Sequence, residues 1–149
     1  MNDTILKFGY PGTLIREYTH WVLLLRPAQA TLGSMVLAHK SDAQSAGDLD
    51  AESYAELARI KAEVESTLRE LFGMEKINYL MLMMVDREVH YHVIPRYSQE
   101  KKFGAQSFTD PGWPAVPALG PTNEVSPEVF TALGLALRDG WITKGETSG

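Results

Sequence analysis

Short, largely apolar runs bounded by turn residues recur through residues 5–38, which is the pattern expected of β-strands. Turn residues separate these runs, notably Tyr10-Pro11-Gly12 after the first run and Arg26-Pro27 after the third. The pattern predicts strands at Ile5–Phe8, Leu14–Glu17, Trp21–Leu25 and Ser34–Ala38.

The spacing changes to a helical period after residue 49. Asp50 is placed to cap a helix, with Leu49 and Tyr54 spaced as a hydrophobic staple across that cap. Gly73 is placed to end the helix, because glycine readily adopts the left-handed conformation. We expect one apolar stripe to pack on a sheet, formed by Tyr54, Leu57, Ile60, Val64, Leu68 and Leu71.

Two further strands are predicted at Ile77–Met84 and Val89–Arg96. The first is apolar almost throughout, which favours a central place in the sheet with both faces buried. The short link at residues 85–88 predicts a tight antiparallel hairpin. These elements indicate an α+β fold with a mainly antiparallel sheet and one long helix.

A segment rich in proline and glycine follows Tyr97 and predicts a long irregular excursion. We expect Trp113 to anchor this segment to the sheet; stacking on a nucleobase is the alternative. A final short helix is predicted from Pro127, capped by Ser126, to about Arg138. The remaining residues, 143–149, are expected to be mobile. We therefore expect a single domain over 1–149, with a core at about 5–97 and an extension at 98–149.

Composition narrows the classes of function. A net charge of −5 argues against a general nucleic-acid-binding protein, which would need a basic field. The absence of cysteine excludes disulfides, thiolate metal sites and cysteine nucleophiles. The sequence has neither an export signal nor an apolar run long enough to span a membrane, so we expect a cytoplasmic protein without a membrane partner.

The most informative pattern is His90-Tyr91-His92, in which two histidines lie two residues apart in a predicted strand. Side chains at i and i+2 share one face, so Glu88, His90 and His92 are predicted to lie together. A neutral imidazole can attack phosphorus, and a second imidazole can donate a hydrogen bond to a phosphate oxygen. Arg96 adds positive charge for holding a phosphate.

The segment from His90 to Arg96 resembles the second half of the histidine-triad (HIT) motif, in which three histidines alternate with apolar residues. The segments 21–27 and 32–37 resemble the early hairpin of that fold. The resemblance implies a HIT-like antiparallel sheet packed against one long helix, followed here by a proline- and glycine-rich extension and a short final helix.

The resemblance also implies a function. Proteins of this family are nucleotide hydrolases or transferases, usually homodimers, that act on dinucleoside polyphosphates or nucleoside phosphoramidates. The middle histidine, the nucleophile, corresponds to His90, and the third, which contacts the phosphate, corresponds to His92. Arg26 and Ser34 lie in the similar early segments and are candidates for substrate binding. No cofactor is required, although a divalent metal is possible.

Glu88 stands where the family has its first histidine. Its carboxylate can orient His90 through a hydrogen bond, or it can repel an anionic substrate and raise the pKa of the histidine. Two other functions stay open: a nucleotide-binding dimer without turnover, and a metal protein with two histidines and one carboxylate. His20 and His39 are expected to be structural or surface residues.

Overall fold

The computed structural model describes residues 1–120 and 123–144. The elements in chain order are α1 (Asp3–Lys7), β1 (Leu14–Glu17), β2 (Trp21–Leu25), β3 (Met35–His39), a 3₁₀ turn (Ala46–Asp48), α2 (Ala51–Phe72), β4 (Lys76–Leu80), β5 (His90–Arg96), β6 (Lys101–Phe103), β7 (Gln106–Phe108) and α3 (Pro127–Asp139). Five of the strands form one antiparallel sheet in the order β1-β2-β3-β5-β4.

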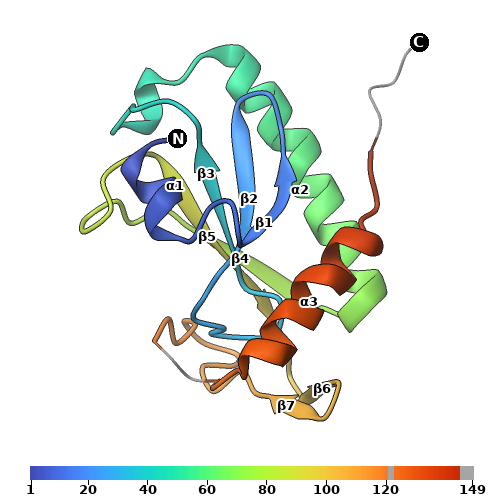
Figure 1. Cartoon of the computed structure of the whole chain (residues 1–149). Coiled ribbons are helices and arrows are strands. Elements are labelled where there is room, and N and C mark those ends of the chain that lie inside the picture. The colour runs from blue at the N-terminus through green and yellow to red at the C-terminus, as the bar shows by residue number, and fades with distance from the viewer. Residues whose placement is uncertain (121–122, 145–149) are drawn as a thin grey trace.

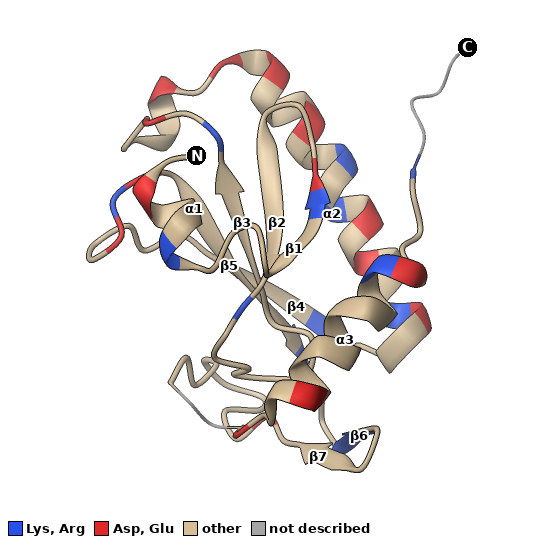
Figure 2. Ribbon diagram, viewed as in Figure 1, with Lys and Arg blue, Asp and Glu red and all other residues tan. Residues whose placement is uncertain are grey.

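The two faces of this sheet are covered differently, and Figure 1 shows α1 and α2 on opposite sides of it. On the α2 face, strand side chains such as Leu23, Leu37 and Val93 pack in one buried cluster with residues of α2 and α3. On the other face, Ile5 of α1 packs in a smaller cluster with Val22, Leu24, Val36 and Ala38. Charged residues lie mainly on the helices and loops, whereas β2 and β3 carry almost none (Figure 2).

The predicted long helix is confirmed. The Asp50 carboxylate accepts a hydrogen bond from the Ser53 N–H at 2.9 Å, and Gly73 ends the helix at a φ of 67°. The apolar stripe is buried at Leu57, Ile60, Val64 and Leu68. Tyr54 does not belong to it, because this residue is 41% exposed and its hydroxyl donates to the carbonyl of Ala46.

The predicted strand at residues 5–8 is wrong, because residues 3–7 form α1. The Asn2 side chain accepts a hydrogen bond from the Ile5 N–H at 3.0 Å, which caps a helix at this point. The Asn2 amide also donates to the carbonyls of His39 and Ser41, at 2.9 and 2.8 Å, and so fixes α1 against the end of β3. A run this short has no clear period, so the cap and its tertiary contacts decide its conformation.

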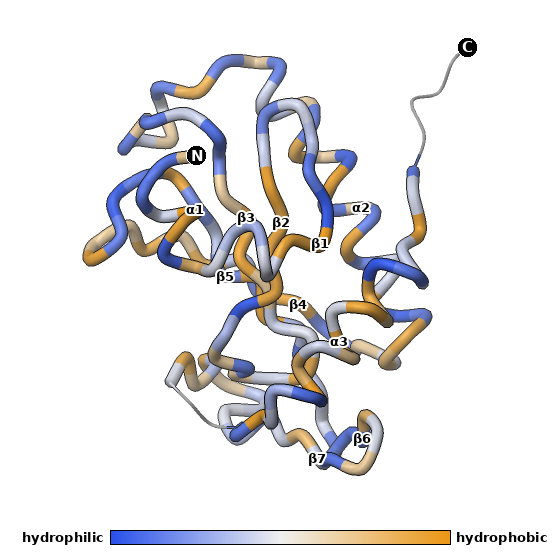
Figure 3. Tube along the Cα trace, viewed as in Figure 1, coloured by the Kyte–Doolittle hydropathy of each residue, from blue (hydrophilic) through white to orange (hydrophobic). Residues whose placement is uncertain are grey.

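The central position predicted for Ile77–Met84 is also wrong. The strand is shorter, Lys76–Leu80, and lies at the edge of the sheet, where its residues are exposed or half-buried. The tight hairpin is replaced by a loop over residues 81–89. Apolar residues in this loop account for the run that resembled a buried strand, and Figure 3 shows a hydrophobic stretch at its projecting tip.

The extension contains a small hairpin, β6-β7, that the sequence analysis did not predict, and α3, which it did. The Ser126 hydroxyl caps α3 by accepting from the Val129 N–H at 3.2 Å. Of the predicted mobile tail, residues 145–149 lie outside the described residues. Within the described ranges, no helix combines the length and the apolar character that crossing a membrane requires.

Candidate functional site

His90 and His92 lie side by side on β5, on the sheet face that α1 covers. Their ring centroids are 5.1 Å apart at an angle of 79°, and the Phe8 ring at the end of α1 lies 5.9 Å from each. The two histidines are only 1% and 8% exposed. The predicted same-face pairing of these two histidines is confirmed, and α1 shields both from bulk solvent.

The hydrogen bond of His90 determines which of its ring nitrogens carries the proton. Its Nδ1 lies 2.7 Å from the carbonyl oxygen of Glu88, and a carbonyl can only accept. The proton is therefore on Nδ1, which leaves the Nε2 lone pair of a neutral ring available for attack on an electrophile.

His92 has the opposite arrangement. The Nε–H of Arg26 donates to His92 Nδ1 at 3.3 Å, so this nitrogen accepts and the proton of the neutral ring is on Nε2. Burial, the positive charge of Arg26 and the neighbouring His90 together lower the pKa of His92 to about 4. The ring is therefore neutral near pH 7, with Nε2–H as a hydrogen-bond donor.

Arg26 is held in place by more than the imidazole. Its Nη1 donates to the Ala28 carbonyl at 2.8 Å and its Nη2 to the Leu119 carbonyl at 3.0 Å, and the residue is 9% exposed. The predicted substrate-binding residue thus lies next to the histidines as a fixed positive charge.

The Glu88 carboxylate does not bond His90, which was the first of the two roles predicted for it. Glu88 precedes β5, and its carboxylate accepts a hydrogen bond from the Thr4 hydroxyl at 3.2 Å. It is therefore the backbone carbonyl of Glu88, not its carboxylate, that bonds His90. A second tie between the loop and α1 joins Lys7 Nζ to Asp86 at 2.6 Å. Both ties hold the loop over 81–89 against α1.

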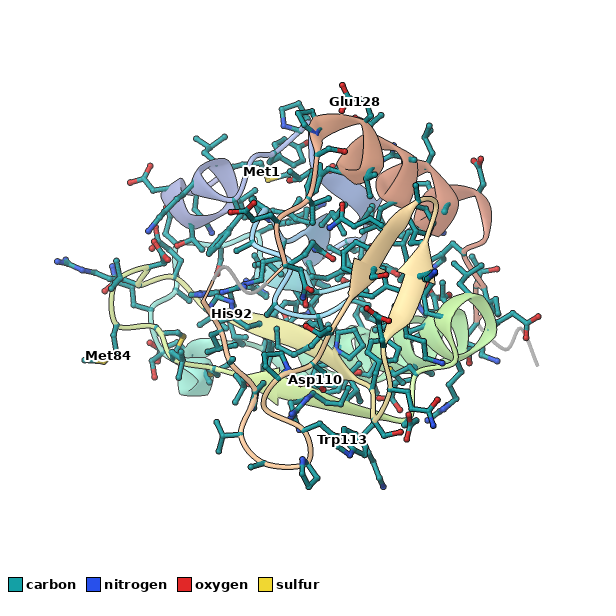
Figure 4. All side chains as sticks on the ribbon, turned by 90° about the horizontal axis from the view of Figure 1, so that it is seen from below. Met1, Met84, His92, Asp110, Trp113 and Glu128 are labelled. Carbon is teal, nitrogen blue, oxygen red and sulfur yellow. The ribbon has the colours of Figure 1, made fainter. Side chains whose placement is uncertain are left out.

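A cavity of about 270 Å³ opens in front of the two histidines, here called the histidine cavity. Its other wall is the loop segment Leu82–Asp86. The tip of this loop is strongly exposed and apolar, since Met84 and Val85 are each 83% exposed. Figure 4 shows Met84 at the outer end of the loop and His92 in the interior.

Arg96 and Ser34 are not brought to the histidine cavity. The Arg96 guanidinium binds both oxygens of Asp110, at 2.7 and 3.1 Å, and also Asn78 and the Ala115 carbonyl. The Asp110 side chain is fully buried, so this ion pair fastens the 109–117 segment to the sheet. Ser34 is fully buried, and its hydroxyl donates to the Thr31 carbonyl at 2.9 Å.

The other two histidines lie on the opposite face of the sheet, the α2 face, where His39 directly follows Ala38, the residue paired with His90. His39 Nε2 lies 2.8 Å from the Ser53 hydroxyl and its Nδ1 2.8 Å from that of Ser41, and His20 stacks on its ring at 6.4 Å. These contacts hold the start of α2 against β3. Among residues 1–120 and 123–144, no three histidine or acidic side chains cluster closely enough to hold a metal ion.

Phe8 and the segment Leu82–Asp86 are parts of the site that the sequence analysis did not identify. Both were expected to belong to strands or to a tight turn, so no pattern placed them near the histidines. Only the chain reversal at α1 and the loop at 81–89 bring them there.

Comparison with known proteins identifies the fold. No family model matches the sequence, and no curated protein is similar to it. A histidine triad protein of Sinorhizobium meliloti has a TM-score of 0.72 and 20% identity, covering 94% of this chain and 95% of its own. One from Marinobacter aquaeolei has a TM-score of 0.72 and 19% identity, with coverages of 95% and 94%.

A third similar structure is a hypothetical histidine triad nucleotide-binding protein of Sulfolobus tokodaii. It has a TM-score of 0.66 and 17% identity, and the alignment covers 92% of this chain and 88% of that one. The chain therefore has the fold of the histidine triad proteins, which confirms the predicted fold class.

Proposed function

We propose that this chain hydrolyses a nucleotide, or transfers its nucleotidyl group, through a covalent intermediate on His90. The substrate class is a dinucleoside polyphosphate or a nucleoside phosphoramidate, attacked at its α-phosphate. The observation that carries the proposal is the complementary state of the two histidines. His90 offers a lone pair at Nε2 and His92 offers a proton at Nε2, on the same face of one strand.

In the first step, His90 Nε2 forms a bond to the α-phosphorus while the bond from phosphorus to the leaving group breaks. The leaving group departs with the bonding electron pair and takes its proton from solvent. The ring then carries a positive charge, which the Glu88 carbonyl stabilises by accepting from Nδ1–H. His92 Nε2–H donates to a non-bridging phosphate oxygen, where negative charge grows.

In the second step, water attacks the same phosphorus and the N–P bond breaks. The products are a nucleoside monophosphate and neutral His90, with the proton of water released to solvent. If another hydroxyl compound replaces water, the same intermediate gives nucleotidyl transfer. The buried site favours this chemistry, because hydrogen bonds to a charged phosphate are stronger where water is largely excluded.

An acidic protein needs a local positive charge to hold a nucleotide, and Arg26 supplies it. Its guanidinium is fixed beside His92 by two backbone carbonyls, so the charge requires no reorganisation when the phosphate arrives. The exposed apolar residues of the 81–89 loop lie where they would cover a bound substrate.

We also propose that the protein is a homodimer in which the β4 strands of two copies pair. β4 lies at the edge of the sheet, and an unpaired edge strand can extend a sheet into a second chain. Sedimentation of the wild type and a Tyr79→Pro variant tests this, because proline removes a backbone N–H from β4. Loss of the dimer in the variant is expected; a monomeric wild type would contradict the proposal.

The decisive experiment for the chemistry is to trap the intermediate. Metal-free protein is mixed with a diadenosine polyphosphate or an adenosine phosphoramidate, quenched quickly and examined by mass spectrometry. We expect an acid-labile adenylyl group on His90 and release of AMP over time. Because neither step needs a metal, addition of a chelator is expected to leave both unchanged.

Three variants serve as comparisons. His90→Ala and His90→Gln should form no adduct while still folding and unfolding cooperatively, and His20→Ala, which changes a histidine outside the site, should form the adduct normally. Normal turnover in both His90 variants would contradict the mechanism. Nucleotide binding without an adduct in the wild type would instead identify a binding protein, and turnover only with added metal would identify a metal-dependent one.

A further inference from the structure

The proline- and glycine-rich extension returns to the histidine site at Arg26. The described residues of 109–123 are here called the strap. The strap begins at the buried ion pair of Asp110 with Arg96, the last residue of β5. Further along, the Leu119 carbonyl accepts a hydrogen bond from Arg26 Nη2 at 3.0 Å. The strap is therefore fixed to the strand that carries the two histidines, and it also bonds the arginine beside them.

The Leu119 carbonyl helps to fix the plane of a buried guanidinium. Arg26 is buried, and among the described residues no carboxylate forms an ion pair with it. Its orientation therefore depends on neutral acceptors, which are the carbonyls of Ala28 and Leu119 at the two Nη atoms and His92 Nδ1 at Nε. Because a guanidinium is rigid and planar, acceptors at two of its nitrogens also decide where the third N–H points.

The bond from Arg26 to His92 is the most sensitive of these three. It is 3.3 Å long, whereas the bonds to the two carbonyls are 2.8 and 3.0 Å long. A side-chain contact of about 3.6 Å is no longer a hydrogen bond, so a shift of the guanidinium by roughly 0.3 Å is enough to break it. A small displacement of the strap can therefore reach the proton of His92.

A second set of contacts joins the strap to the turn that carries Arg26. Asn123 Nδ2 donates to the carbonyls of Gln29 and Ala30, at 3.0 and 3.1 Å. The Gln29 side chain is fully buried, and its Nε2 donates to the carbonyls of Arg26 and Ser34, at 2.7 and 2.8 Å. Asn123 thus holds the backbone of the residue whose side chain fixes the backbone of Arg26.

We propose that the strap is a positioning element of the histidine site, in which Asn123 and the Leu119 carbonyl hold Arg26 in the orientation that keeps the His92 proton on Nε2. Asn123 acts through Arg26 and takes no direct part in the reaction. Its effect on turnover rests on the proposed function, because that function makes His92 the donor to the phosphate. Its effect on the His92 ring does not, and it can be measured without any substrate.

Nitrogen-15 NMR of the His92 ring at pH 7 tests the assignment in the full chain. Asn123→Ala removes both bonds donated to the turn, and Asn123→Asp removes them as well but keeps an acceptor for the Thr109 N–H. In both variants the ratio of the Nε2–H to the Nδ1–H tautomer should fall by about 2- to 10-fold, as expected for the loss of one hydrogen bond. Formation of the His90 adduct should slow by a similar factor.

Gln106→Ala is the matched control. The Gln106 side-chain amide also donates to a backbone carbonyl, that of Glu124, but this bond lies within the extension. Gln106→Ala should therefore lower the stability, as Asn123→Ala does, while leaving the His92 spectrum unchanged. In a chain that already carries Arg26→Met, Asn123→Ala should change the spectrum no further, because the residue that transmits the effect has been removed.

The wild type alone supplies a second measurement, so the test holds even if the Asn123 variants unfold. If the carbonyls of Ala28 and Leu119 hold the Arg26 guanidinium, its rotation about the Nε–Cζ bond should be slow and its two Nη atoms should give separate NMR signals. A single averaged signal would show that the guanidinium turns freely and would overturn the assignment.

The outcomes separate the role of the strap from the proposed function. A changed His92 spectrum in Asn123→Ala but not in Asn123→Asp would overturn the assignment, since the effect would then come from the bond to Thr109. A His90 adduct in the wild type, with an unchanged spectrum in Asn123→Ala, would overturn it and leave the covalent mechanism standing. A changed spectrum in a protein that forms no adduct would support the role of the strap and contradict the mechanism.

Discussion

Arg26 donates its Nε–H to Nδ1 of His92 at 3.3 Å, across 66 positions of the chain. This contact fixes the proton of the neutral imidazole on Nε2, the nitrogen proposed to contact the phosphate. Arg26 thus positions His92, in addition to supplying the fixed positive charge proposed to hold the nucleotide.

Replacement of Arg26 by methionine should release His92 from this state. The pKa of His92 should rise from about 4 towards its ordinary value, because one of the groups that lowers it is removed while burial remains. Nitrogen-15 NMR of the imidazole should show both tautomers, and nucleotidyl transfer should slow by up to about 100-fold. Arg87→Met, which changes an exposed arginine in the 81–89 loop, is the control. If Arg26→Met gave the same NMR spectrum as the wild type, Arg26 would not fix the tautomer of His92.

The lowered pKa of His92 makes stability depend on pH. The unfolded chain binds a proton at His92 below about pH 6.5, whereas the folded chain does so only below about pH 4. The stability that neutral His92 gives the folded state is therefore complete above pH 6.5 and is lost as the pH falls from 6.5 to 4. We expect a loss of about 2 kcal/mol, with allowance for solvent that enters through the cavity. Urea unfolding of wild type and His92→Gln at pH 7 and pH 4.5 measures it, and parallel losses in the two proteins would contradict the assignment.

The buried Arg96–Asp110 pair should be essential for stability. Asp110→Ala leaves a buried guanidinium without its carboxylate, which should lower the free energy of unfolding by about 3–5 kcal/mol. The exposed pair Lys7–Asp86 is the comparison, and Lys7→Met should cost less than about 1 kcal/mol. Equal costs for the two substitutions, measured by chemical denaturation, would show that burial of the first pair does not matter.

The Glu88 carboxylate should matter little for the chemical step. Its partner is the Thr4 hydroxyl, and the group that bonds His90 is a backbone carbonyl that substitution retains. Glu88→Gln should therefore form the adduct at nearly the wild-type rate, whereas loss of the Thr4 bond in Glu88→Ala or Thr4→Val costs about 1 kcal/mol of stability. A large fall in the rate of Glu88→Gln at unchanged stability would mean that the carboxylate acts directly.

Several features of this protein could be read from the sequence because they depend on neighbouring residues. The α2 helix follows from the Asp50 cap, the spacing of Leu57, Ile60, Val64 and Leu68, and the glycine at 73. The shared face of His90 and His92 follows from the two-residue period of a strand, which holds in any sheet. These features require no knowledge of what the segment packs against.

Tertiary structure decided the rest, because the deciding partners are distant in the chain. The sequence of β4 predicts a central strand, yet the strand order places it at the edge of the sheet. The sequence of α1 predicts a strand, but Asn2 caps a helix there and bonds the carbonyls of His39 and Ser41. Arg96 was predicted to bind a phosphate, but its guanidinium forms a buried ion pair with Asp110. An isolated sequence specifies which hydrogen bonds a side chain can make, whereas only the fold determines which partner it meets, and most buried polar groups do find one.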